Sequence, residues 1–220
     1  MVVTIDGPAG SGKSTAARKL AARLQIAYLD TGAMYRAIAL AALVRGVDLS
    51  DENAVTGLAR GLRLELDCGP TFTRVKVDGV DVSEAIRTMA VSRATSEVAQ
   101  HQAVRALLVA EQRKIGRRLG SFVSEGRDQG SVVFPEADAK FVLEAGAVKR
   151  AERRYQEHVA DGEEISLEAV LENVLARDAI DSKQWEPLLI RGEAIVLDTT
   201  HLSIAEVIDR MVAELDRIRS

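Results

Sequence analysis

The architecture follows from one stretch near the start of the chain, Gly7-Pro8-Ala9-Gly10-Ser11-Gly12-Lys13-Ser14, which is followed by Thr15. It has the spacing G-x-x-x-x-G-K-[ST], which is typical of a loop that wraps around phosphate groups. Glycines remove side chains that would hold the backbone away from phosphate oxygens, and they allow the unusual dihedral angles that wrapping needs. Lys13 adds a mobile positive charge for the β- and γ-phosphates, and the Ser14 hydroxyl can ligate a Mg²⁺ ion that bridges them.

The segments on either side of the loop support this interpretation. Residues 2–6 form a compact, β-branched apolar run, which predicts a buried strand. After the loop, Ala17, Leu20 and Leu24 recur at helical spacing across residues 14–24. Strand, glycine loop and helix is the required order, because the helix N-terminus adds partial positive charge at the phosphate. The alternative is an ordinary glycine-rich turn, but this context favours a nucleoside triphosphate site.

Composition narrows the class of protein. The 220 residues are 47% hydrophobic and 28% charged, which is ordinary for a soluble globular chain with one sizeable core. A net charge of −4 argues against a general nucleic-acid or anionic-membrane surface. The single cysteine, Cys68, cannot form an internal disulfide and fits a reducing compartment. With no signal peptide and no long apolar span, we expect a cytoplasmic protein and, by default, a monomer.

The rest of the chain alternates between buried strands and helices. Further strands are predicted at residues 26–30, 121–124, 140–144 and 194–198. With residues 2–6 they predict five parallel strands in an open, doubly wound α/β sheet. Asp30-Thr31-Gly32 and Glu125-Gly126-Arg127-Asp128 follow two of these strands, at the carboxyl edge where such sheets bind ligands. The alternative for Arg127 and Asp128 is a structural surface ion pair.

Two insertions interrupt this pattern. Residues 62–66 and 72–77 alternate between apolar and polar, and Asp78-Gly79 is a type I′ turn signal, so we expect a small antiparallel subdomain at about residues 60–95. Helices are predicted over residues 83–100 and 102–119. A second helical pair, rich in cations and broken near residues 160–164, could close over phosphates as a lid, although four cations on a helix can also form a solvated face. Ser203 and Glu206 form a capping box that opens the last helix.

Arginine residues point to a second anionic ligand. They come from four segments, as Arg36, Arg127, Arg153 with Arg154, and Arg177. Arg36 lies in the first turn of a predicted helix, where the dipole prefers anions, so an external anion is expected there in preference to plain solvation. One triphosphate already has Lys13, so the additional arginines suggest a second phosphorylated ligand and a transferring phosphoryl group. If a phosphate oxygen is the acceptor, positioning and charge neutralisation suffice without a catalytic base.

Five spaced segments together resemble the bacterial cytidylate kinases. They are IDGPAGSGKST at residues 5–15, LDTGAMYR at 29–36, EGRDQG at 125–130, VVFP at 132–135 and RDAIDS at 177–182. The resemblance implies a P-loop fold of the nucleoside monophosphate kinase type that transfers the γ-phosphoryl group of ATP to CMP or dCMP, in pyrimidine nucleotide metabolism. It implies one domain over residues 1–220. The core would be residues 1–59, 96–153 and 178–220, with the nucleotide-binding insertion at about 60–95 and the lid at about 154–177.

The resemblance also implies a role for each matched residue. Lys13 and the loop from Gly7 to Thr15 hold the ATP phosphates, and Ser14 holds Mg²⁺. Arg36 and Arg127 grip the monophosphate of CMP or dCMP, Thr31 and Tyr35 line that site, and Asp30 is assigned to it. Ser96, Arg105 and Asp128 match the positions that read the cytosine edge, which offers an amino donor for a carboxylate and acceptors for an arginine. Asp181 matches the residue that contacts the sugar, and Arg154 and Arg177 match lid-side arginines that close on the phosphates.

One position departs from the pattern. Gln184 stands where the family usually has an arginine, with Lys183 just before it. Glutamine cannot neutralise a phosphate, so either Lys183 substitutes or a phosphate contact is weaker. Lysine is a point charge where arginine is a bidentate fork, so the exchange is not neutral.

Two other functions remain open from the sequence. A related small-molecule kinase could act on another nucleoside monophosphate or on an alcohol, in which case Asp30 or Asp128 could serve as the base. A nucleotide-dependent switch protein also uses a phosphate loop, but the chain has no Asn/Thr-Lys-x-Asp guanine signature and its extra arginines would have no role there.

Overall fold

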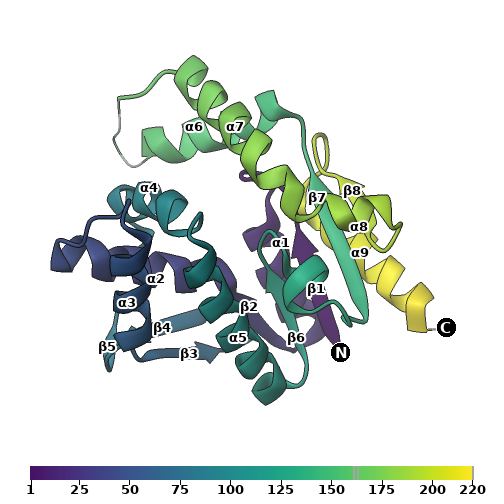
Figure 1. Ribbon diagram of the computed structural model, residues 1–220. Coiled ribbons are helices and arrows are strands. Elements are labelled where there is room, and N and C mark those ends of the chain that lie inside the picture. Colours follow the sequence, from purple (N-terminus) through teal and green to yellow (C-terminus); the bar gives the residue numbers. More distant parts are fainter. Residues whose placement is uncertain (161, 163, 220) are drawn as a thin grey trace. The chain divides into compact units, whose positions relative to one another are not determined.

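The computed structural model describes residues 1–160, 162 and 164–219, apart from the side chains of residues 177, 180 and 181. The chain divides into two compact units (Figure 1). The first consists of Met1–Leu24 and Val123–Ser220, and the second of Gln25–Phe122.

A five-stranded parallel sheet confirms the predicted fold class. Its strands are β1 (Val2–Asp6), β2 (Ala27–Asp30), β6 (Phe122–Glu125), β7 (Ala139–Glu144) and β8 (Ile195–Asp198). Their spatial order is β2-β6-β1-β7-β8, so the strand that precedes the phosphate loop lies in the centre. Ile5 of β1 is opposite Phe141 of β7, and Phe141 is opposite Ile195 of β8.

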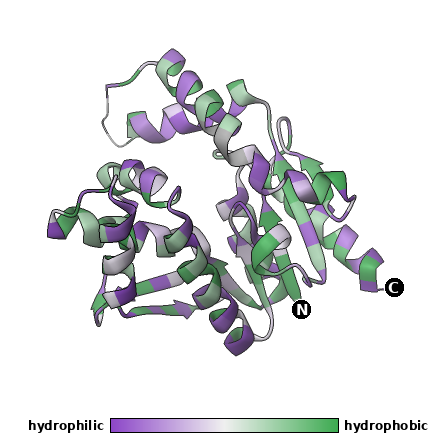
Figure 2. Ribbon diagram, in the orientation of Figure 1, coloured by the Kyte–Doolittle hydropathy of each residue, from purple (hydrophilic) through white to green (hydrophobic). Residues whose placement is uncertain are grey.

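The central strands are buried because helices cover parallel sheets on both faces. Val3, Ile5, Phe141 and Val142 are fully buried. Figure 2 shows β1 and β7 mostly in the colour of hydrophobic residues, whereas α6 (Ala147–Ala160) is largely hydrophilic. The apolar runs that predicted strands are therefore the core of this sheet, and the polar residues at the strand ends are left for the ligand edge.

The first unit contains the helices α1 (Lys13–Leu24), α6, α7 (Leu167–Asp181), α8 (Glu186–Ile190) and α9 (Ile204–Arg219). Helices α6 and α7 pack together through Ala151, Val170 and Val174, so they form the predicted helical pair. The capping box before α9 is confirmed, since the Ser203 amide donates to Glu206 Oε2 (2.8 Å) and the Glu206 amide donates to Ser203 Oγ (3.3 Å). The sequence analysis missed α8. Its residue Leu188 packs in a buried cluster with Val142 of β7.

The second unit contains the predicted antiparallel sheet. Its elements are α2 (Thr31–Arg45), α3 (Glu52–Gly61), β3 (Leu64–Cys68), β4 (Thr73–Val77), β5 (Val80–Asp81), α4 (Met89–Val98) and α5 (Gln102–Leu119). Asp78 and Gly79 both have positive φ angles, 51° and 87°, which confirms the type I′ turn between β4 and β5.

One predicted helix is wrong in its extent. The expected helix over residues 83–100 is divided into a short 3₁₀ turn at Ala85–Arg87 and α4, which begins at Met89. Between them Thr88 is extended, with φ −66° and ψ 155°. The break lets the Arg87 guanidinium donate to Asp30 Oδ2 at 2.9 Å, a long-range contact that periodicity cannot reveal. Among the residues described, no helix has both the length and the apolar character needed to cross a membrane.

Candidate active site

The loop between β1 and α1 has the backbone geometry that its glycines predict. Gly7 has φ 133°, and a Cβ atom there would collide with the carbonyl oxygen of Leu143 on β7. Gly10 has φ 77°, and a Cβ atom there would lie 3.1 Å from the Cβ of Arg150. Only glycine combines these angles with such close neighbours.

Four successive carbonyl oxygens of the loop each accept a hydrogen bond from a side chain. The pairs are Pro8 with Lys13 Nζ (2.7 Å), Ala9 with Arg150 Nη1 (3.2 Å), Gly10 with Arg153 Nη1 (3.3 Å) and Ser11 with Thr199 Oγ1 (3.1 Å). In a trans peptide the N–H group points away from the C=O group. The loop therefore turns these carbonyl oxygens toward protein donors, which lets amides on the opposite side of the peptides face an anion, as in a phosphate-binding nest. The Ser11 amide is an exception, since it donates to the Pro8 carbonyl at 3.4 Å.

Lys13 is almost fully buried, with 5% of its surface exposed. Burial, and then the charges of Arg127 and Arg154, lower the pKa of its ammonium group, while Glu125 and Asp6 oppose this effect. The structure thus gathers Lys13, Arg127 and Arg154, three of the expected catalytic residues, within electrostatic reach of one another. A phosphate among these cations would remove their mutual repulsion and favour the charged lysine.

Ser14 lies at the start of α1 and donates its hydroxyl to Glu125 Oε1 at 2.8 Å. Glu125 is buried at the end of β6, next to Gly126 and Arg127. The sequence analysis gave Glu125 no role, although a carboxylate at the end of a buried strand was a usable signal. A hydroxyl and a carboxylate are the hard oxygen donors that Mg²⁺ prefers, so this pair fits that ion.

The loop after β6 carries two expected residues. Arg127 is half-buried and Asp128 is buried, and a single wide π turn follows at Gln129–Val133. Arg127 lies within electrostatic reach of Lys13, as described above. Asp128 accepts a long hydrogen bond (3.4 Å) from Gln129 Nε2.

Arg150 and Arg153 hold the phosphate loop from α6. Arg150 is buried, donates to the Ala145 carbonyl at 2.8 Å, and forms a bidentate pair with Asp178 on α7. Arg153 donates to the Thr199 carbonyl at 2.9 Å as well as to the loop. Their backbone contacts make these two cations structural parts of the loop, in place of the solvated face that is the alternative for such a helix.

Two further expected residues, Arg177 and Asp181, lie outside the side chains that the structure describes. Thr15 is exposed on the first turn of α1.

A cavity of about 510 Å³ opens beside Pro8. Its lining includes Gly146, Arg150, Trp185 and Thr200.

In the second unit, Asp30 organises the start of α2. It is buried and caps the helix, since the Ala33 amide donates to Asp30 Oδ1 at 2.9 Å. Arg36 donates to Asp30 Oδ2 at 2.8 Å, and Arg87 donates to the same oxygen at 2.9 Å. Burial disfavours the charged carboxylate, but the two arginines outweigh it and lower the pKa of Asp30. Arg87 is a residue that the sequence analysis missed.

Arg36 therefore has an anionic partner within its own unit. Its Nε atom is buried and has no hydrogen-bond partner among the described residues. Thr31 is buried beside it, and Tyr35 is half-buried in the same turn. Thr31, Tyr35 and Arg36 are the residues that the resemblance assigns to the monophosphate site.

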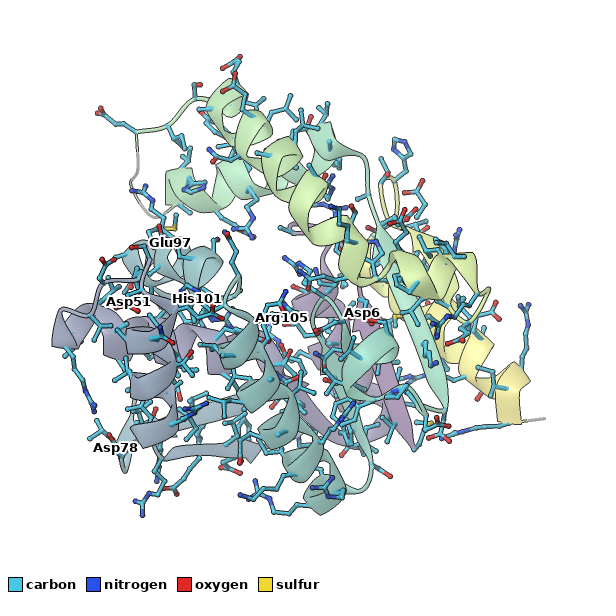
Figure 3. The ribbon with its side chains drawn as sticks, viewed as in Figure 1. Asp6, Asp51, Asp78, Glu97, His101 and Arg105 are labelled. Atoms are coloured by element: carbon cyan, nitrogen blue, oxygen red, sulfur yellow. The ribbon has the colours of Figure 1, made fainter. Side chains whose placement is uncertain are left out.

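Ser96 and Arg105 lie half-buried on α4 and α5 (Figure 3 labels Arg105). Nearby His101, which precedes α5, places Nε2 2.7 Å from the Leu49 carbonyl, a structural contact. No local signal in the sequence marks Ser96 or Arg105, and only the resemblance singled them out.

Comparisons with known proteins give the family. The family model "Cytidylate kinase" matches residues 3–217. The chain is 43% identical over 217 residues to a cytidylate kinase of Bacillus pumilus (strain SAFR-032), covering 98% of this chain and 96% of that protein. It is 44% identical to a cytidylate kinase of Rhodococcus opacus (strain B4), covering 96% and 93%.

A solved structure shares the fold alone. The crystal structure of an uncharacterized protein from Eubacterium ventriosum ATCC 27560 aligns with a TM-score of 0.51 at 12% identity, over 99% of this chain and 98% of that one. The family match and the two relatives cover nearly the whole chain. The chain belongs to the cytidylate kinase family.

Proposed function

We propose that this protein transfers the γ-phosphoryl group of ATP to CMP or dCMP, producing ADP and CDP or dCDP in pyrimidine nucleotide metabolism. The observation that carries the proposal is the phosphate loop, in which side chains bind four successive carbonyl oxygens and the buried Lys13 lies within electrostatic reach of Arg127 and Arg154. The family membership supplies the substrate class.

On the donor side, the loop amides and Lys13 bind the ATP phosphates, and Ser11 adds a buried hydroxyl that has no partner among the described residues. Ser14 and Glu125 would hold Mg²⁺, which neutralises charge on the β- and γ-oxygens when bound. The cavity beside Pro8 is large enough for the nucleoside part of ATP. These features support ATP as the donor.

On the acceptor side, Arg127 binds the monophosphate and Asp128 accepts from the cytosine amino group. In the second unit, Arg36 is proposed to contribute its guanidinium to the same phosphate. Ser96 and Arg105 complete base recognition. The nucleophile is a phosphate oxygen that is already ionised at neutral pH, so cations that position it and neutralise charge are sufficient.

The helical pair α6–α7 is proposed as a lid that brings Arg154 and Arg177 onto the transferring group. The insertion at about residues 60–95 is proposed as part of the nucleotide-binding subdomain. We also propose that the protein works as a cytoplasmic monomer. Its single cysteine, which cannot form an internal disulfide, supports the compartment.

A coupled ADP-release assay with CMP, dCMP, UMP, AMP and shikimate as acceptors tests the proposal. Cytidine nucleotides should be preferred, and Asp128→Ala should lose much of the preference for CMP over UMP. Equal turnover of all acceptors would favour a broader kinase. Slow ATP hydrolysis that no monophosphate accelerates would favour a switch protein.

A further inference from the structure

Asp6, which is labelled in Figure 3, is the last residue of β1. Its hydrogen bonds connect the strand that leads into the phosphate loop with the loop that follows β6. Its side chain is fully buried, so it cannot touch a ligand in the loop. Oδ1 accepts the Gln129 amide at 2.8 Å, and Oδ2 accepts the Gly130 amide at 2.8 Å. These two amides come directly after Arg127 and Asp128 in the chain.

The joint around Asp6 is closely packed. A Cβ atom on Gly130 would lie 2.8 Å from Thr4 Oγ1 and 3.3 Å from Asp6 Oδ2, so only glycine lets the loop approach the strand this closely. Ser124 Oγ, on β6, donates to Gln129 Oε1 on this loop at 2.7 Å. The backbone after Asp128 is therefore held by the carboxylate and by the side chain of Gln129.

Among the described residues, the charged groups that act on Asp6 include Asp128, on the loop after β6, and Lys13, at the start of α1. Burial above all, and Asp128 in addition, raise the pKa of Asp6 to about 7, although the two amides and Lys13 favour the charged form. A buried carboxylate is costly unless it is fully hydrogen-bonded. The two amide contacts at 2.8 Å offset part of that cost in the observed arrangement of the loop.

We propose that Asp6 is a positioning residue for the acceptor nucleotide, which fixes Arg127 and Asp128 relative to Lys13 by binding the amides of Gln129 and Gly130. The inference rests on the proposed function. It assigns a role in acceptor binding to a residue that touches neither substrate.

Asp6→Asn is the informative variant because it keeps the shape and removes one acceptor. The amide side chain can accept only one of the two backbone N–H groups and turns its own N–H toward the other. Leaving a buried donor unpaired disfavours this arrangement of the loop, and a tenfold loss in binding, which corresponds to about 1.4 kcal/mol, is within the usual cost of such a donor. We expect the KM for CMP to rise at least about tenfold, with the preference for CMP over UMP reduced and the KM for ATP changed less than about twofold.

Thr4→Val is the matched control. Thr4 is on the same strand, is fully buried, and its hydroxyl has no partner among the described residues. Its replacement should leave both KM values unchanged. A merely structural role for Asp6 would lower the unfolding midpoint and alter both KM values together, or neither, and that result would overturn the proposal.

The wild-type enzyme provides a readout that needs no variant. Protonation of Asp6 below about pH 7 removes an acceptor from one amide, so the KM for CMP should rise between pH 8.5 and pH 6 beyond the titration of the CMP phosphate itself. Asp6→Asn should lack this additional rise. A wild-type KM that follows only the nucleotide's own titration would refute the proposal, even if the variant fails to fold. A wild-type enzyme without cytidylate kinase activity would instead refute the proposed function.

Discussion

Replacing Asp30 tests how much a single buried carboxylate stabilises the second unit. Asp30→Ala removes the cap of α2 and leaves Arg36 and Arg87 without their carboxylate. Asp30→Asn keeps a good capping side chain and removes only the charge. The two variants therefore separate the cap from the ion pairs.

The expected magnitudes follow from the contacts. Loss of the cap costs about 1 kcal/mol. Breaking a buried pair costs about 3–5 kcal/mol when the partner stays buried, but the side chains of Arg36 and Arg87 are 21% and 48% exposed and regain water. We therefore expect a loss of about 3 kcal/mol in the free energy of unfolding for Asp30→Ala and about 2 kcal/mol for Asp30→Asn.

The assay is urea unfolding followed by far-UV circular dichroism, because the single tryptophan, Trp185, lies in the other unit. The folded-state pKa of Asp30 is lowered, so its stabilisation is complete above the ordinary value of about 3.9 and is lost as the pH falls through the folded value. The wild-type advantage over Asp30→Asn should accordingly shrink in acid. Equal losses for the two variants, or an advantage that persists in acid, would refute this reasoning.

Three further predictions concern other residues. Glu125→Gln keeps an acceptor for Ser14 but removes a charge, so the Mg²⁺ concentration for half-maximal activity should rise severalfold while the KM for CMP stays the same; an unchanged metal requirement would exclude Glu125 from the metal site. Gln184→Arg should leave turnover equal or higher in steady-state assays, and a collapse would show that Gln184 has a different role. Burial raises the pKa of Cys68 to about 11, so at pH 8 about one thiol in a thousand is ionised. Its reaction with a disulfide reagent should therefore be slow in the folded protein and fast in urea, and rapid labelling of the folded protein would contradict the burial.

Local sequence signals predicted the parts of the fold that depend on near neighbours. The loop from Gly7 to Ser14 is flanked by the expected strand and helix, and Asp78-Gly79 forms the expected turn. The capping box at Ser203 is likewise present. In each case the residues that decide the structure are within a few positions of one another.

The sequence could not reveal features that depend on distant contacts. Arg150 resembles any cation on a helix, and only its contacts with the Ala9 carbonyl and Asp178 show that it is structural. Arg87, in the 3₁₀ turn just before the break at Thr88, contacts Asp30, which is 57 residues away in the sequence. Helix α8 has five residues, too few for a helical period to be recognised.

The four side chains that bind the loop carbonyls come from separate segments of the sequence, so the residues that shape the nucleotide site are not contiguous. Three of them, Arg150, Arg153 and Thr199, are 141, 143 and 188 residues away from the carbonyl that each one binds. Substitutions there would tilt individual peptide planes without altering any residue of the glycine motif. Redesign of nucleotide affinity in this protein should therefore treat α6 and the end of β8 as parts of the phosphate loop.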